Sequence, residues 1–377
     1  MKIGCYLFLF LTLTVSCITH YEQAGADGYN HILVVEGIIT NGTTVITLSN
    51  TIGLGNWFND KIYVDNAVLY VDREDGVRSG VSQYDGQGRY LIETPIPDTT
   101  SRYRLTIFLD EKEYRSQYLT PIITPEFTTS WSMDERWNVN ICVSTYDKQE
   151  QFRHFLWTYQ ENWEVTSKIF VDSFFYAADT FVNNLYSRDN FYRCWKEDRS
   201  NHFILGSTTA LVSNTIINKD LNSFHFTDER TNTLYCIHVK QNIIRDESYL
   251  YFSNLQKNAE RTGTIFSPIP SEIIGNVTCV SHPNTAVIGY VDVSTTTERK
   301  QYISREEAYT EAEYICFITK DAPGLVKQPD WAYFWIFEHG VRIKVWMPAS
   351  CLDCTFSGIK GSNGSKDKPS WWPNDHL

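Results

Sequence analysis

The chain has 377 residues, 42% of them hydrophobic and 15% aromatic, and a formal net charge of −12. This acidic balance argues against a nucleic-acid partner, which would need a basic face, and against adhesion to anionic lipid by charge alone. The hydrophobic content excludes a disordered chain, and the length suits two or three domains. The 23 Tyr, 21 Phe and 11 Trp, against 3 Met, favour a β-rich fold, because aromatic residues are enriched in strands.

The first sixteen residues have the pattern of a secretory signal peptide. Lys2 precedes an apolar run, residues 3–13, that is too short to span a bilayer, and Ser16 stands before Cys17 as in a bacterial lipobox. We therefore expect a signal peptide over residues 1–16, with diacylglycerol attached to the sulfur of Cys17 after cleavage. The alternative is an ordinary signal peptide with a chance cysteine. Two acyl chains give stable membrane anchoring.

A polar tether is expected over residues 17–29, followed by short alternating strands over residues 30–122. The segment HILVVEGIITNGTTVITLSNT consists of two β-branched runs around an Asn-Gly dipeptide, which predicts a hairpin. In the later segment YRLTIFLDEKEYRSQYLT, Tyr103, Leu105, Ile107 and Leu109 share one parity and predict a core-facing strand. Regularly spaced short strands with turn signals predict an Ig-like β-sandwich.

A larger β-rich domain is predicted over residues 123–350. One segment, FRHFLWTYQENWEVTSKIF, places five apolar or aromatic residues on one parity: Phe155, Trp157, Tyr159, Trp163 and Val165. The first interpretation is the core face of a large sheet. The second is an aromatic platform for sugar rings or peptide side chains, which makes Trp157 and Trp163 candidate ligand-binding residues.

One long helix stands out in this domain, in the segment DESYLYFSNLQKNAERTG. Its pattern predicts a helix near residues 246–262 that Asp246 caps at the start. Phe252, Leu255 and Ala259 form a stripe at helical spacing and are expected to be buried. The fold class predicted from the whole chain is thus mostly β, with an N-terminal sandwich and a larger β-rich domain carrying one main α-helix.

The C-terminal tail, residues 351–377, opens with Cys351-Leu-Asp-Cys354. An oxidising envelope permits disulfides, a second close Cys/His pair that would complete a zinc site is missing, and the flanks do not provide the strand–helix context of a redox pair. We therefore predict a Cys351–Cys354 bridge, leaving free thiols or other pairings, a metal site and redox chemistry as alternatives. A second bridge between Cys194 and Cys279 would agree with the cysteine count, although spacing does not fix connectivity.

The bridge would fix a turn so that Trp371 and Trp372 dock on the body of the protein. Both tryptophans are also candidate ligand-binding aromatics.

Catalytic motifs are missing from the sequence, which has no Gly-x-Ser-x-Gly elbow, His-Glu-x-x-His helix or phosphate loop. Glu161 and Glu164 flank Trp163 and resemble the paired carboxylates of glycosidases. An offset of three residues in a strand would point them to opposite faces, which argues against that role. The turn at Asp72–Gly76 is acidic but lacks the ligands of a calcium loop. No catalytic residue, cofactor or metal site is predicted.

Several long segments resemble a family of Bacteroidota lipoproteins built around a domain of unknown function. They are LVVEGIITN, CWKEDRSNHFILGST, NLQKNAERTGTIFSPIPSEIIGNVTCVSHPNTAVIGYVDVST and CLDCTFSGIKGSNGSKDKPSWWP. The resemblance covers residues 30–373, and it departs from the family in a longer tail with Ser370-Trp371-Trp372 in place of Asp-Phe-Trp. It implies an outer-membrane location and genes beside TonB-dependent receptors, but no established activity.

These observations together predict a non-catalytic envelope lipoprotein, an accessory or binding component of a TonB-dependent uptake system. Its expected partners are the membrane, a TonB-dependent receptor and a glycan or peptide ligand. The alternatives are a surface hydrolase of glycan or peptide and a purely structural envelope protein. An exposed aromatic patch would favour binding, whereas perturbed titratable groups in a deep pocket would favour hydrolysis. The sequence does not distinguish the periplasmic from the cell-surface side.

The lipid anchor leads to the first prediction. Cys17→Ala should release the protein from membranes, because covalent lipid is the only anchor that we expect. Metabolic labelling with a palmitate analogue should mark the wild type and not the variant. Retention of the variant on membranes washed with high salt and carbonate would contradict a lipid anchor.

Overall fold

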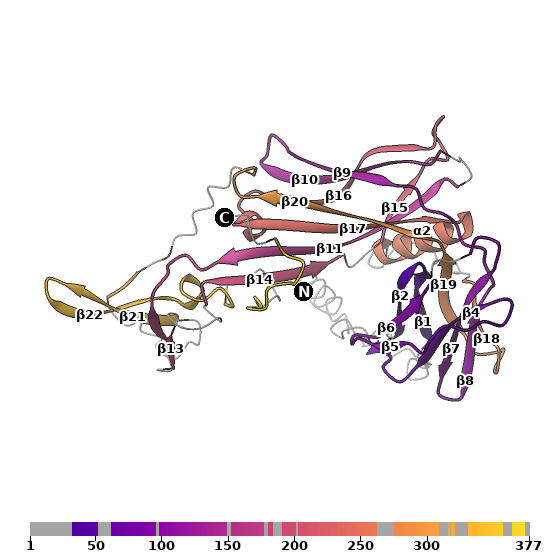
Figure 1. Ribbon diagram of the computed structural model, residues 1–377, viewed down its shortest axis with the longest axis horizontal. Helices are drawn as coiled ribbons and strands as arrows, with labels where there is room; N and C mark the ends of the chain where they lie inside the picture. The colour runs from indigo at the N-terminus through magenta and orange to yellow at the C-terminus, as the bar shows by residue number, and fades with distance from the viewer. Residues whose placement is uncertain are drawn as a thin grey trace, which may run out of the picture.

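The computed structural model describes residues 32–51, 62–95, 98–148, 152–176, 180–183, 191–200, 203–261, 275–308, 316, 318–320, 331–356 and 364–373. Across these ranges the protein is mostly β, with five sheets and one α-helix (Figure 1), which confirms the predicted fold class. The predicted signal peptide, the tether and Cys17 lie outside the described residues. Among the residues that are described, no helix is long and apolar enough to cross a membrane.

The N-terminal unit is a β-sandwich. Its first sheet has the order β19-β1-β2-β6-β5, with β3 paired to β2. The strands of this sheet are β1 Leu33–Ile39, β2 Gly42–Asn50, β3 Ile62–Tyr63, β5 Gln83–Tyr84, β6 Arg89–Thr94 and β19 Val287–Val293. The facing sheet, in the order β18-β8-β7-β4, consists of β4 Val68–Arg73, β7 Tyr103–Leu109, β8 Lys112–Ser116 and β18 Val277–Cys279. The predicted core face of β7 is confirmed for Tyr103, Leu105 and Ile107, which are buried, and Leu109 packs half-buried against the same core.

Two strands of this sandwich come from a distant part of the sequence. β19 pairs in parallel with β1, placing Val291 beside Gly37, and β18 pairs antiparallel with β8. The predicted bounds of the second domain, 123–350, include residues 277–293. Their apolar side chains instead complete the core of the first sandwich, since Val277 and Val291 belong to the same buried cluster as Val35.

The central unit is a second, larger sandwich. One sheet has the order β14-β11-β17-β20 with β15 paired to β11, and the other has the order β16-β10-β9. The strands are β9 Phe127–Met133, β10 Asn138–Tyr146, β11 His154–Thr166, β14 Arg193–Arg199, β15 Ile204–Ser207, β16 Thr215–His225, β17 Leu234–Ile244 and β20 Thr296–Ser304. A short 3-10 helix, η2 Glu229–Thr231, precedes β17.

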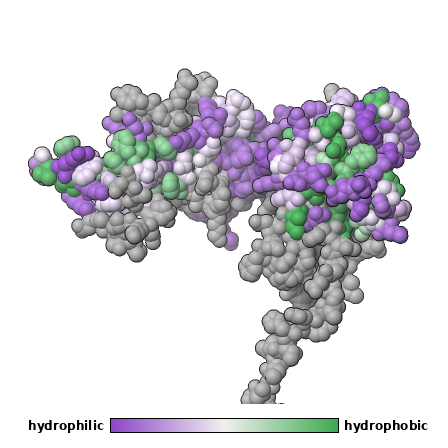
Figure 2. All heavy atoms as spheres, turned by 90° about the horizontal axis from the view of Figure 1, so that it is seen from below, coloured by the Kyte–Doolittle hydropathy of each residue, from purple (hydrophilic) through white to green (hydrophobic). Residues whose placement is uncertain are grey.

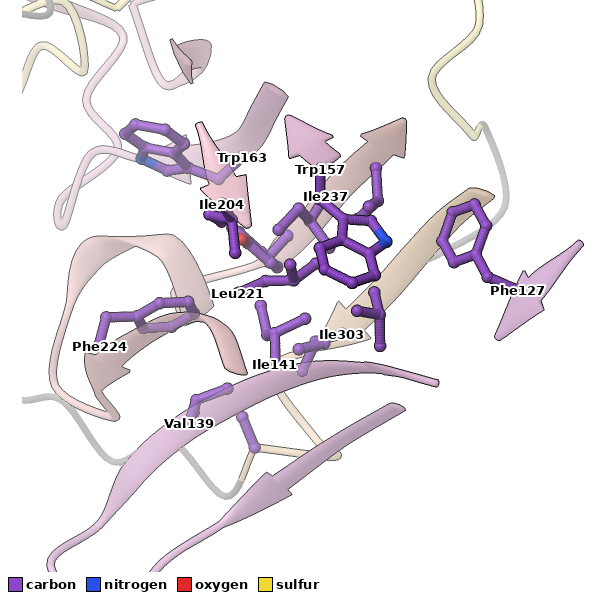
Figure 3. Packing of buried hydrophobic residues seen from close by; sticks show 14 of the residues in the cluster. Phe127, Val139, Ile141, Trp157, Trp163, Ile204, Leu221, Phe224, Ile237 and Ile303 are labelled. Carbon is purple, nitrogen blue, oxygen red and sulfur yellow. The ribbon is translucent and has the colours of Figure 1, made fainter. Parts of the chain in front are cut away.

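The core between these sheets distinguishes the two interpretations of β11, which were a core face and a ligand-binding platform. Phe155 and Trp157 are fully buried, and Trp163 and Val165 are each 2% exposed. Figure 3 shows Trp157 among Ile237, Ile141 and Ile303, side chains that come from both sheets. The shared parity therefore marks a core face, and the interpretation of Trp157 and Trp163 as a ligand platform is wrong.

The α-helix α2, Asp246–Arg261, joins the two sandwiches. Phe252 and Tyr251 pack with Leu156 and Ile244 of the central sandwich and with Tyr290 of the first. The predicted helix is confirmed, and so is the burial of Phe252; Leu255 is half-buried, and the side chain of Ala259 is outside the described part. Asp246 is the first helical residue rather than a residue that precedes the helix.

Truncation of the helix side chain that reaches both sandwiches should be costly. Phe252→Ala should lower the free energy of unfolding by roughly 3 kcal/mol, because Phe252 is 2% exposed and its removal leaves a cavity. Leu250→Ala on the same helix is the matched control: Leu250 is 59% exposed, and the change should be within about 0.5 kcal/mol. Equal losses for both variants in denaturant titrations would contradict the packing described.

Candidate binding face of the distal sheet

A fifth, four-stranded sheet lies beyond the central sandwich, and we call it the distal sheet. Its order is β13-β12-β21-β22, formed by β12 Ser173–Tyr176, β13 Phe181–Asn183, β21 Trp331–Glu338 and β22 Val341–Pro348. The β21–β22 hairpin projects from the body and forms the left end of the molecule in Figure 1. Its turn is made by His339 and Gly340, both at positive φ.

One face of the distal sheet is buried against a short segment that follows β22. Phe174, Ala332 and Met347 are fully buried there, together with Leu352 and Cys351. The segment includes the 3-10 helix η3 Ala349–Cys351. This cluster of buried residues is small, so the sheet depends on further attachment to the body.

Two disulfides provide that attachment. Cys194 of β14 is bonded to Cys354, with their Cα atoms 5.6 Å apart, and Cys316 is bonded to Cys351, with a Cα separation of 6.1 Å. The predicted Cys351–Cys354 bridge is therefore wrong, and so is a Cys194–Cys279 bridge, because Cys279 is a free thiol in the first sandwich. The physical reason is that the two sulfurs of the tail enter different cores: Cys354 lies in the central core and Cys351 in that of the distal sheet.

The other face of the distal sheet is aromatic, and we call it the aromatic face. Four of its rings stand in register across the four strands: ring centroids are 5.1 Å apart for Phe181 and Phe175, 5.0 Å for Phe175 and Tyr333, and 4.7 Å for Tyr333 and Trp346. Two more rings, Trp335 and Phe337, continue the face along β21 toward the hairpin turn, because alternate residues of a strand share a face.

The outer rings of the aromatic face are exposed. Trp335 is 38% exposed, Phe181 55% and Phe337 79%, and Val341 beside the turn is 62% exposed. Figure 2 shows hydrophobic residues at this end of the molecule. Clustered exposed apolar side chains of this kind are typical of interaction sites, whereas single ones are not.

Two cations lie over these rings. Lys344 Nζ is 3.4 Å from the ring centroid of Tyr333 and 4.4 Å from that of Trp346, and the guanidinium of Arg342 is 4.5 Å from the ring of Trp335. Among the described residues of the four strands, the same face presents no carboxylate. Glu338 alternates to the opposite face, where its carboxylate pairs with Lys320 at 2.5 Å.

The sequence pattern alone does not reveal this face. The segment WAYFWIFE has apolar residues at both parities, which reads as a strand buried on both sides. The signal that could have identified it is the partner strand, in which Arg342 and Lys344 stand at alternate positions opposite Phe337 and Trp335. Cations without a nearby carboxylate are seldom buried, so these two positions indicate an exposed face.

Of the four aromatics predicted to bind ligand, three are buried. Besides Trp157 and Trp163, Trp372 is only 3% exposed: it packs with Leu234, and its Nε1 donates a hydrogen bond to Glu164 Oε2 at 3.0 Å. Trp371 is 39% exposed and lies under Lys300, whose Nζ is 3.9 Å from the ring centroid. The tail thus docks on the central sheet through Trp372, as predicted.

The two glutamates that resembled a catalytic pair are engaged separately. Glu161 accepts hydrogen bonds from Tyr235 at 2.7 Å, Asn222 at 2.7 Å and Arg230 at 3.0 Å, and burial raises its pKa against the opposing effect of Arg230. Glu164 contacts Trp372 on the other side of the sheet. This agrees with the prediction that their offset separates them by face.

A second buried carboxylate in this region is paired with a lysine. Lys196 Nζ lies 2.9 Å from both oxygens of Glu229, and Trp163 Nε1 donates to the same carboxylate at 3.3 Å. Lys196 is 2% exposed. Both charges are thus satisfied inside the protein and are not presented to a substrate.

In the part of the chain that the structure describes, no three His, Cys, Asp or Glu side chains gather as a metal would require. The acidic turn at Asp72–Gly76 is occupied by arginines: Arg78 donates to Asp72 at 2.6 and 3.1 Å, and Arg73 donates to Asp75 at 2.8 and 2.6 Å.

The disulfide pattern can be tested by mass spectrometry. Because Cys351 and Cys354 lie on one tryptic peptide, the non-reduced digest should contain a species that joins three peptides, those of Cys194, Cys316 and the tail. Reduction should add about 4 Da, two hydrogens per bridge, to the intact chain. A tail peptide that carries its own internal bridge would contradict the connectivity.

The buried lysine pair leads to a stability prediction. Lys196→Met should cost about 3–5 kcal/mol in the free energy of unfolding, because it leaves the Glu229 carboxylate buried without its cation. Adding Glu229→Gln should recover much of that loss, since the amide removes the charge and still accepts from Trp163. A single variant as stable as the wild type would show that the pair is not buried as described.

Comparison with known proteins places the chain in a family without an assigned activity. A family model described as "Domain of unknown function (DUF4249)" matches residues 18–300, more than half of the chain. No curated protein matches. A crystal structure of the chicken CNTN1 FN1-FN3 domains is similar at 10% identity with a TM-score of 0.14; the match covers 57% of this chain and 62% of that one.

Proposed function

We propose a function for this chain, which belongs to the family described as "Domain of unknown function (DUF4249)", from the aromatic face of its distal sheet. The protein is a non-catalytic lipoprotein of the outer membrane. It serves as an accessory or binding component of a TonB-dependent nutrient-uptake system and contacts its ligand or partner through the aromatic face.

The observation that carries this proposal is the exposure of the face. Phe337, at 79% exposed, and Trp335, at 38%, lie on a hairpin that projects from the body. A monomer gains nothing from leaving such rings in water, because burial of apolar area is worth roughly 25 cal/mol per Å². Large exposed aromatic residues are the anchors that interfaces use most.

The attachment of the hairpin supports the same function. Cys316–Cys351 fastens the segment under the distal sheet, and Cys194–Cys354 fastens that segment to the central sandwich. A face held in this way is preorganised, so that less conformational entropy is lost when a partner binds.

The membrane location and the link to uptake come from the sequence. The lipobox at Cys17 supports a lipid anchor, and the resemblance to Bacteroidota lipoproteins supports an association with TonB-dependent receptors. A hydrolase is the alternative, but no arrangement of described residues favours it, since the carboxylates Glu161 and Glu229 are held by Arg230 and Lys196.

Site-specific photo-crosslinking in intact cells tests this proposal. A benzophenone amino acid in place of Phe337 should form an adduct with another envelope component. The same substitution at Trp137 should not, although Trp137 is itself 56% exposed on the turn between β9 and β10. Affinity purification from native outer membranes should recover a TonB-dependent receptor with the wild type.

Two results would contradict the proposal. Equal crosslinking from positions 337 and 137 would mean that the aromatic face has no dedicated partner. Purified membranes in which no receptor accompanies the protein would remove the link to TonB-dependent uptake while leaving the binding face intact.

A further inference from the structure

We infer that the aromatic face binds an anionic polysaccharide of the uronate type; this inference rests on the proposed function, because it names the ligand class of the same face. The chain as a whole carries a formal charge of −12, yet this face presents Arg342 and Lys344 and no described carboxylate. A local reversal of charge on an acidic protein attracts an anion to that place.

The arrangement of rings and cations points to a ligand that is both apolar and anionic. In the register of the hairpin, Trp335 stands opposite Lys344 and Phe337 opposite Arg342. The outer part of the face therefore has two consecutive cross-strand units, each with one aromatic ring and one cation. Within them the guanidinium of Arg342 reaches over Trp335, and Nζ of Lys344 reaches over Tyr333 and Trp346.

A uronate polymer has the complementary chemistry. Each sugar carries an apolar C–H face, which stacks on an aromatic ring, and one carboxylate, which accepts charge-assisted hydrogen bonds from lysine or arginine. Arg342 is exposed and has the planar fork that suits a carboxylate. Across the strands, the exposed ring of Phe181 and the half-buried ring of Phe175 extend the apolar surface beyond these two units, whereas Tyr333 and Trp346, which lie under Lys344, are buried.

The same residues argue against a lipid surface as the occupant. The end of the hairpin that would enter a bilayer first carries Glu338 beside the turn, and a carboxylate is costly in hydrocarbon. An acidic peptide would supply carboxylates without the stacking sugar faces, so it should bind more weakly. Both are therefore outcomes that an experiment must separate from the polysaccharide.

The test measures binding of the full-length protein to four probes. These are polygalacturonate, its methyl ester, poly-glutamate and phosphatidylglycerol vesicles. Polygalacturonate should bind most tightly, and its neutral methyl ester about tenfold more weakly, since esterification removes the anion and keeps the sugar. Added salt should weaken binding of polygalacturonate but not of its ester.

Substitutions test the contributions of the cation and of the aromatic ring in each unit separately. Arg342→Gln and Lys344→Gln should abolish the preference for polygalacturonate over its ester, whereas Trp335→Ala and Phe337→Ala should weaken both polymers. Arg136→Gln and Trp137→Ala are matched controls, since an exposed ring and an exposed cation also neighbour each other there, and they should change nothing. The non-reduced digest confirms that each variant keeps both disulfides.

Three results would overturn the inference: equal binding of both polymers, tighter binding of poly-glutamate, or tighter binding of vesicles. If polygalacturonate fails while crosslinking from position 337 persists, the ligand class is wrong and the proposed function stands. If both fail, the face is not a binding site.

Discussion

The attachment of one six-residue segment determines what the rest of the molecule can present to its surroundings. Residues 349–354 lie under the distal sheet, and their two cysteines are bonded in opposite directions, Cys354 to β14 and Cys351 to Cys316. A sheet with so few buried side chains would be marginal alone, because small cores do not offset the conformational entropy of folding. Once the two disulfides hold the distal sheet in place, its aromatic face does not have to be buried against the body of the protein.

Charged residues have two different settings in this protein: some are paired in the interior and join its units, and others lie on the aromatic face. Arg245 and Asp292 join the sandwiches: the backbone N–H of Arg245 donates to the fully buried Asp292 at 2.9 Å, and its guanidinium reaches Asp292 and the carbonyl of Thr120. Charged groups that are already paired in this way are not available for catalysis. Arg342 and Lys344, by contrast, lie on the aromatic face: the Arg342 guanidinium is over the exposed ring of Trp335, and Lys344 Nζ is over the buried ring of Tyr333.

Local patterns in the sequence were sufficient to predict strands, the helix and many of the core residues. Alternation in β7 and β11 identified buried faces, and the stripe that includes Phe252 identified the helix, because both depend on neighbours a few residues apart. Pairings between strands or cysteines that are far apart in the sequence could not be predicted. The parallel partner of β1 lies some 250 residues away, and the partner of Cys354 is set by which core its sulfur enters. The aromatic face was missed for a related reason: a strand that is apolar on both sides looks buried until its partner is known.

We propose that the aromatic face is covered by a ligand or partner when the protein is in the outer membrane. Hydroxyl-radical footprinting of the same protein, purified and in intact outer membranes, measures this coverage. We expect Trp335 and Phe337 to be oxidised readily in the purified protein and protected in the membrane, whereas exposed Trp137 should be oxidised equally in both. Equal oxidation of Trp335 and Phe337 in the two samples would show that nothing covers the face.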